Sequence, residues 1–70
     1  MQTHLHDAFT AAVASLPQAE RELITMYELE GATTGAAGGA LGMSRSEARV
    51  TLLSARRAMR QNLTARFRAS

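Results

Sequence analysis

The chain has 70 residues, of which 46% are hydrophobic, eight are basic and six are acidic. This length leaves room for one small domain, so we expect a single domain over residues 1–70. The absence of cysteine excludes disulfides and cysteine-ligated zinc, and no apolar run is long enough for a membrane span or a signal peptide. We therefore expect a cytoplasmic protein without a cofactor.

The charges are unevenly distributed. Residues 1–44 contain one arginine and five acidic residues, whereas residues 45–70 contain seven arginines and one glutamate. A basic segment of this kind is typical of a surface that binds phosphate groups. A solvated helix face with no ligand would carry the same charges, so the charge pattern by itself leaves both interpretations open.

Two helices are predicted in the first half of the chain. The first covers residues 3–15, with Thr3 as its N-cap and apolar residues on one face. That face comprises Leu5, Phe9, Ala12, Val13 and Leu16. Pro17 interrupts this pattern and suits the first turn of a second helix, which we expect over residues 17–30, with Gly31 as a left-handed C-cap.

A third, short helix is predicted over residues 33–41, capped by Thr33 or Thr34 and ended by Gly42. Its glycines, at positions 35, 38 and 39, each cost about 1 kcal/mol relative to alanine in a helix. They indicate either close packing against a neighbouring helix, which we favour, or local mobility.

The last helix is predicted over residues 45–64, with a tail that frays from about residue 64. Ser44 and Glu47 have the spacing of a capping box. The buried seam is predicted to comprise Ala48, Leu52, Ala55, Met59 and Leu63, and a separate exposed stripe to comprise Arg45, Arg49, Arg56 and Arg60. The fold class is therefore all-α, a four-helix domain. Its predicted common core is Leu16, Leu23, Ile24, Tyr27, Leu41, Ala48, Leu52, Ala55 and Met59.

The third helix, the turn at Gly42-Met43 and the last helix together form a predicted helix-turn-helix. In such a unit the second helix lies in the major groove of DNA, where arginine can bind guanine, glutamate can accept from cytosine and serine can bind either base or phosphate. We expect the base-facing residues to be Arg45, Ser46, Glu47 and Arg49, and the phosphate-facing residues to be Ser44, Arg56, Arg57 and Arg60.

Several short motifs carry a resemblance to a known family. They are Leu16-Pro17, Arg21-Glu22-Leu23, Leu29-Glu30-Gly31, Leu41-Gly42-Met43-Ser44 and Ala55-Arg56-Arg57-Ala58-Met59-Arg60. Together they resemble region 4 of bacterial sigma factors of the extracytoplasmic-function type, from Leu16 to Leu63. The resemblance implies binding of promoter DNA through the last helix and docking on the flap of the RNA polymerase β subunit.

The chain departs from the family pattern at two places. In the short helix, Ala36, Ala37 and Gly38 replace the usual glutamate, isoleucine and alanine. In the last helix, Val50, Thr51 and Ser54 replace polar and basic residues, and Leu53 stands where a polar residue is common. Val50 and Leu53 would form an exposed apolar patch, which usually marks a partner contact. A rotated helix that buries both is the alternative.

Two functions follow, neither of them enzymatic, because no catalytic constellation is present. The first is a transcription-related domain that binds double-stranded promoter DNA. The second is a protein-interaction module, centred on Val50 and Leu53, for a polymerase subunit, an anti-sigma-like protein, another transcription factor or a second copy. His4 and His6 would point to different faces of a helix and do not suggest a metal site. Because no segment for the downstream promoter element is recognised, we expect either an excised domain or a free-standing protein.

Overall fold

The computed structural model describes residues 2–69, and the side chains of residues 6–68. Its elements are α1 (Gln2–Ala14), α2 (Gln18–Ile24), the π-helical turn η1 (Thr25–Leu29), α3 (Thr34–Ala40) and α4 (Arg45–Ala69). Residues 2–69 contain no strand, and the predicted all-α fold with four helices is confirmed.

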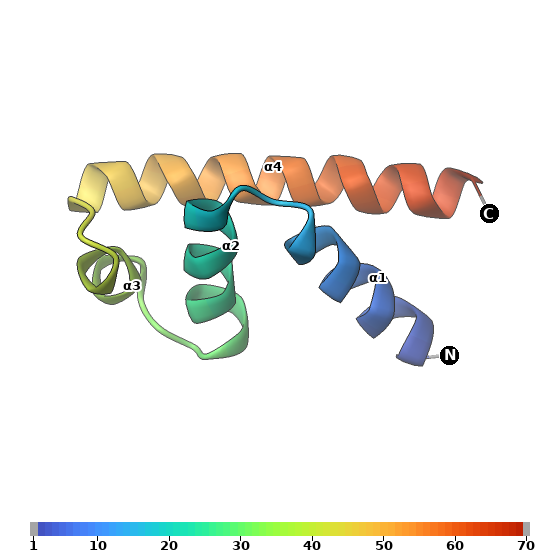
Figure 1. Cartoon of the computed structure of the whole chain (residues 1–70), viewed down its shortest axis with the longest axis horizontal. Helices are drawn as coiled ribbons and strands as arrows, with labels where there is room; N and C mark the ends of the chain where they lie inside the picture. The colour runs from blue at the N-terminus through green and yellow to red at the C-terminus, as the bar shows by residue number, and fades with distance from the viewer. Residues whose placement is uncertain (1, 70) are drawn as a thin grey trace.

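One helix determines the shape of the molecule. At 1.5 Å per residue, the 25 residues of α4 span about 37 Å, close to the longest dimension of 39 Å. Figure 1 shows α1, α2 and α3 lying along the same side of α4, with α3 at its N-terminal end and α1 toward its C-terminal end. The side of α4 that faces away from them is therefore left uncovered.

The core lies between α4 and the three shorter helices. Its buried residues are Ala12, Val13, Leu16, Leu23, Ile24, Ala37, Ala48, Leu52, Ala55 and Met59. Seven of the nine predicted core residues are among them. Tyr27 and Leu41 are only half-buried and pack against the core from its edge. The core prediction omitted Ala12, Val13 and Ala37, the first two although their helix face was recognised.

The predicted helix over residues 17–30 differs from the structure at its first residue and in its C-terminal half. Pro17 is the N-cap and the helix begins at Gln18. After Ile24 the backbone widens into η1, where the N–H of Glu30 donates to the carbonyl of Thr25 at 3.2 Å, five residues earlier. Hydrogen bonds of this spacing define a π-helical turn. The apolar spacing in the sequence suits either kind of helix, so it did not reveal the change.

The helix ends agree with the local signals in the sequence. Gly31 and Gly42 both have φ of 75°, as expected for residues that follow a helix in the left-handed conformation. Of the two candidate caps of α3, Thr33 is the cap, because its hydroxyl accepts from the N–H of Ala36 at 3.1 Å. The helix α1 begins at Gln2, so Thr3 lies within it and is not its N-cap as predicted. The side chains of His4 and Leu5 lie outside the described side chains.

The predicted end of the last helix near residue 64 was too early, since α4 continues to Ala69. Phe67, in these extra turns, lines a hollow together with Phe9 of α1. Leu63 packs against the core next to Phe9. Asn62 donates to the hydroxyl of Ser15, the residue after α1, at 3.3 Å, and it accepts from Arg66 at 2.6 Å one turn further on.

Candidate nucleic-acid interface

The interface is built on the junction between α3 and α4. The chain reverses between Leu41 and Ser44, where the N–H of Met43 donates to the carbonyl of Gly38 at 2.8 Å. A β-carbon added at Gly38 would lie 2.5 Å from that of Ala48, so the two helices are in close contact there. Gly39 has open space around it. Close packing, one of the two readings of the glycines, therefore holds at Gly38 and does not explain Gly39.

The first turn of α4 is closed by the predicted capping box. The N–H of Ser44 donates to Glu47 Oε1 at 3.0 Å, and the N–H of Glu47 donates to Ser44 Oγ at 3.1 Å. The backbone N–H of Ser44, with help from its side chain, lowers the pKa of Glu47 below its ordinary value. Both residues are exposed. Their reciprocal hydrogen bonds cap the helix and fix where α4 begins.

The predicted arginine stripe is present on α4. Arg45, Arg49, Arg56 and Arg60 are all exposed, and at 100° per residue they fall within an arc of about 60° around the helix. Arg57 lies about 60° beyond Arg60, the edge of this arc, so it stands outside the stripe. Ser46, the remaining predicted contact, is exposed in the first turn.

A hollow of about 480 Å³ lies between α3 and the start of α4. The residues that line it are Thr33, Thr34, Gly35, Arg45, Arg49, Leu52 and Leu53. None of them is acidic. Arg45 reaches toward α3, since a β-carbon added at Gly35 would lie 3.8 Å from its Nε. Arg45 and Arg49 thus give this end of the molecule a positive charge with no carboxylate among its neighbours in the hollow.

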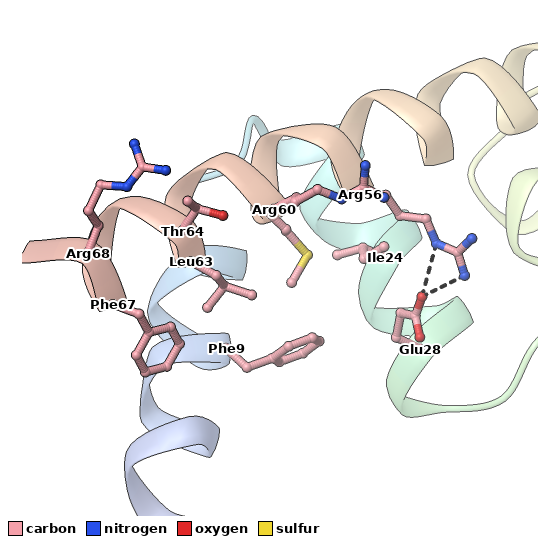
Figure 2. A pocket seen from close by; sticks show the side chains of 10 residues that line it. Phe9, Ile24, Glu28, Arg56, Arg60, Leu63, Thr64, Phe67 and Arg68 are labelled. Atoms are coloured by element: carbon pink, nitrogen blue, oxygen red, sulfur yellow. Dashed lines mark hydrogen bonds and ion pairs between the residues drawn. The ribbon is translucent and has the colours of Figure 1, made fainter.

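Arg56, predicted as a phosphate contact, is held by two side chains of η1. Its Nη2 lies 2.9 Å from Glu28 Oε1 and its Nε 3.2 Å from the same oxygen, as Figure 2 shows with dashed lines. Its guanidinium carbon is 5.0 Å from the ring centroid of Tyr27. The hydrogen bonds to Glu28 raise the pKa of Arg56. Sequence reasoning missed this cluster because 28 residues separate the partners and no local pattern links them.

The proposed apolar patch is exposed. Val50 is 65% and Leu53 60% accessible, and the two lie one turn apart on α4. The alternative, in which a rotated helix buries both, is therefore wrong. Leu53 also lines the hollow between α3 and α4, so the patch and the arginine stripe adjoin each other.

The described part of the chain offers neither a metal-binding cluster nor a membrane-spanning helix. Among these residues no group of three or more histidine, cysteine or acidic side chains could hold a metal ion. No helix described here is both long and apolar enough to cross a membrane.

Comparison with known proteins identifies the kind of domain. The sequence matches the family described as Sigma-70, region 4, over residues 6–59. The match begins in α1, includes the complete α3–α4 junction and ends at Met59, halfway along α4. Neither the curated proteins nor the solved structures gave a match.

Proposed function

Because the chain belongs to the sigma-70 region 4 family, we propose that its α3–α4 unit binds double-stranded promoter DNA. The family consists of transcription-related domains that bind DNA and RNA polymerase, and it is not a family of enzymes. In this proposal the protein acts in the cytoplasm, with RNA polymerase or another transcription factor as its partner. The observation that carries it is the positive, acid-free hollow at the capped start of α4.

In the proposed complex the first turns of α4 enter the major groove. Arg45, Ser46 and Arg49 face base edges, together with the carboxylate oxygen of Glu47 that takes no part in the cap. The remaining proposed contacts, with phosphates, are Ser44, Arg56, Arg57 and Arg60. The exposed arginines support this assignment, because guanidinium groups in water attract phosphates without a large desolvation cost.

The same geometry favours weak binding by the domain alone. Arg56 must leave Glu28 to reach a phosphate, and Arg57 lies about 60° outside the arc of the stripe. Two of the four proposed phosphate contacts are therefore compromised. We expect useful occupancy of a promoter when polymerase or another DNA-bound partner supplies a second contact, which raises the effective concentration of the domain.

A second candidate is favoured by the exposure of Val50 and Leu53. In this alternative the outer face of α4 binds a protein, namely a polymerase subunit, another transcription factor or a second copy of the chain. Apolar side chains that stand together at the surface of a small domain are common at protein contacts.

A paired titration tests the two candidates. Arg49→Ala should weaken binding to a preferred promoter site by about 1–3 kcal/mol without affecting folding. Val50→Asp should abolish binding to polymerase or another protein if the patch is an interface, and should change DNA affinity little, because Val50 does not line the hollow. Arg68→Ala is the matched control, because it removes one arginine at the far end of α4.

Each of the two candidates would be contradicted by one outcome. DNA binding that is absent at low salt, or equally affected by Arg49→Ala and Arg68→Ala, would rule out reading by the first turns of α4. Tight and sequence-selective DNA binding by the isolated domain, indifferent to Val50→Asp, would contradict the partner-dependent view.

A further inference from the structure

One exposed apolar side chain lies among the residues proposed to read DNA. Leu53 lines the hollow between α3 and the start of α4, together with Arg45 and Arg49. It is 60% exposed, whereas the adjacent Leu52, which lines the same hollow, is buried in the core. DNA binding through arginines alone leaves this exposed leucine without a role.

Leu53 continues the row of proposed base-reading residues along α4. Arg45, Arg49 and Leu53 follow one another at intervals of four residues, so successive members lie about 6 Å apart along the helix and about 40° apart around it. Leu53 therefore lies one turn beyond Arg49 and about 20° outside the arc of the arginine stripe. Val50, the other residue of the apolar patch, lies about 80° outside that arc and does not line the hollow.

The hollow combines hydrogen-bond donors with an apolar side chain. Arg45 and Arg49 supply the donors, Leu53 supplies the apolar surface, and no lining residue is acidic. A complementary ligand therefore presents acceptor atoms beside a hydrophobic group. The major-groove edge of DNA does so where thymine lies near guanine, because guanine has the acceptors N7 and O6 and thymine carries a C5-methyl group. An apolar protein surface would cover Leu53 but leave both guanidinium groups without partners.

We infer that Leu53 determines specificity by contacting the C5-methyl group of a thymine in the major groove. This role rests on the proposed function, since it requires the first turns of α4 to lie in that groove. Apolar side chains recognise thymine through this methyl group, which cytosine lacks. With α4 along the groove, the 6 Å between Arg49 and Leu53 corresponds to about two base steps of 3.4 Å. We therefore expect the thymine about two base pairs from the guanine that Arg49 binds.

The contact should be measurable in binding without a change in folding. Burial of one methyl-sized group changes an affinity about fourfold. Because Leu53 is exposed in the free chain, its truncation removes little from the folded state. A loss of affinity on truncation therefore reports a contact made with DNA.

The test uses the full chain and duplexes that it selects at low salt from a pool with a randomised central segment. In the best-bound duplex each thymine is replaced in turn by deoxyuridine, which removes the C5-methyl group and keeps every hydrogen-bonding atom of the base. Fluorescence anisotropy should show that one of these replacements weakens binding by the parent chain about fourfold.

Variants of α4 assign the effect to Leu53. Leu53→Ala should weaken binding to the thymine duplex about fourfold or more, and should bind the thymine and deoxyuridine duplexes equally. Leu53→Gln should prefer adenine at this position, because the glutamine amide donates to N7 and accepts from the N6 amino group of adenine. Val50→Ala is the matched control, since it shortens an exposed apolar side chain outside the hollow and should keep the dependence on thymine. Circular dichroism checks that each variant keeps its helices.

Three results would overturn the role of Leu53. If selective DNA binding depends on Arg49 but no deoxyuridine replacement weakens it, the first turns of α4 read DNA without Leu53. If a deoxyuridine replacement weakens the parent chain and Leu53→Ala equally, another residue contacts the methyl group. If the chain selects no sequence and Arg49→Ala leaves its DNA affinity unchanged, the proposed function itself fails, and the role of Leu53 fails with it.

Discussion

Gly38 of α3 and Ala48 of α4 are packed directly against each other: a β-carbon on Gly38 would lie 2.5 Å from the β-carbon of Ala48. Both residues are buried. Any side chain at position 38 would push α3 away from the helix that is proposed to contact DNA. The close packing of α3 against α4 therefore depends on the absence of a side chain at position 38.

We expect Gly38→Ala to destabilise the domain, although alanine gains about 1 kcal/mol of helix propensity. Overpacking typically costs about 1–3 kcal/mol, and here the obstacle is a packed alanine that cannot rotate away. Gly39→Ala is the matched control, since its β-carbon would meet nothing within 4 Å and should stabilise by about 0.5–1 kcal/mol. Denaturant unfolding of both variants measures the difference. Equal stabilisation by the two changes would mean that α3 and α4 are not in contact at this point.

Leu52→Ala should lower the free energy of unfolding by about 2–5 kcal/mol, because Leu52 is 7% exposed and its truncation leaves a cavity in the core. This loss is a large part of the stability of so small a domain. Leu53→Ala, one residue further on and 60% exposed, should change the free energy of unfolding by about 0.5 kcal/mol or less. If the two variants melt together, the orientation of α4 described here is incorrect.

Glu28→Gln should strengthen DNA binding, because it releases Arg56 from its ion pair. Each phosphate that an arginine neutralises contributes about −0.9 to the log–log salt slope, so the released arginine should steepen the slope of the parent chain by up to about 0.9. The exposed ion pair itself contributes only about 0–1 kcal/mol to folding. Glu30→Gln makes the same change in net charge outside the cluster, so equal slopes for both variants would show that Arg56 does not contact DNA.

The capping box should make the start of α4 sensitive to acid. The pKa of Glu47 is lowered in the folded protein, so its ionised form stabilises the fold above the ordinary value of 4.5, and this contribution is lost as the pH falls through the lowered value. Glutamine keeps the cap geometry without titrating. Thermal melts at neutral and acidic pH should therefore show a smaller acid-induced loss for Glu47→Gln than for the parent. Glu30→Gln, which removes a carboxylate outside the capping box, should not reproduce the effect.

The parts of this fold that follow from local chemistry were predictable from the sequence. The capping box at Ser44 and Glu47 and the left-handed glycines at 31 and 42 depend on neighbours a few residues away, and each occurs as predicted. The exposed stripe on α4 followed from helical periodicity in the same way.

Features that depend on distant partners were not predictable from spacing. The extension of α4 to Ala69 carries Phe67, which lines a hollow together with Phe9 of α1. The capture of Arg56 depends on the π-helical turn that carries Tyr27 and Glu28. In both cases the sequence contains the residues but not the information that they lie side by side.

Because α4 is a single uninterrupted helix, its two ends are fixed relative to each other in both distance and rotation. A residue inserted between Arg49 and Met59 would turn the far end by about 100° and shift it by 1.5 Å relative to α3. The number of residues between these positions therefore determines the direction in which anything held beside Phe67 would face with respect to a duplex at Arg49. If molecules bind at both ends of α4, the number of residues between the two sites sets the distance and the rotation between them. The identity of the exposed side chains matters less for this geometry.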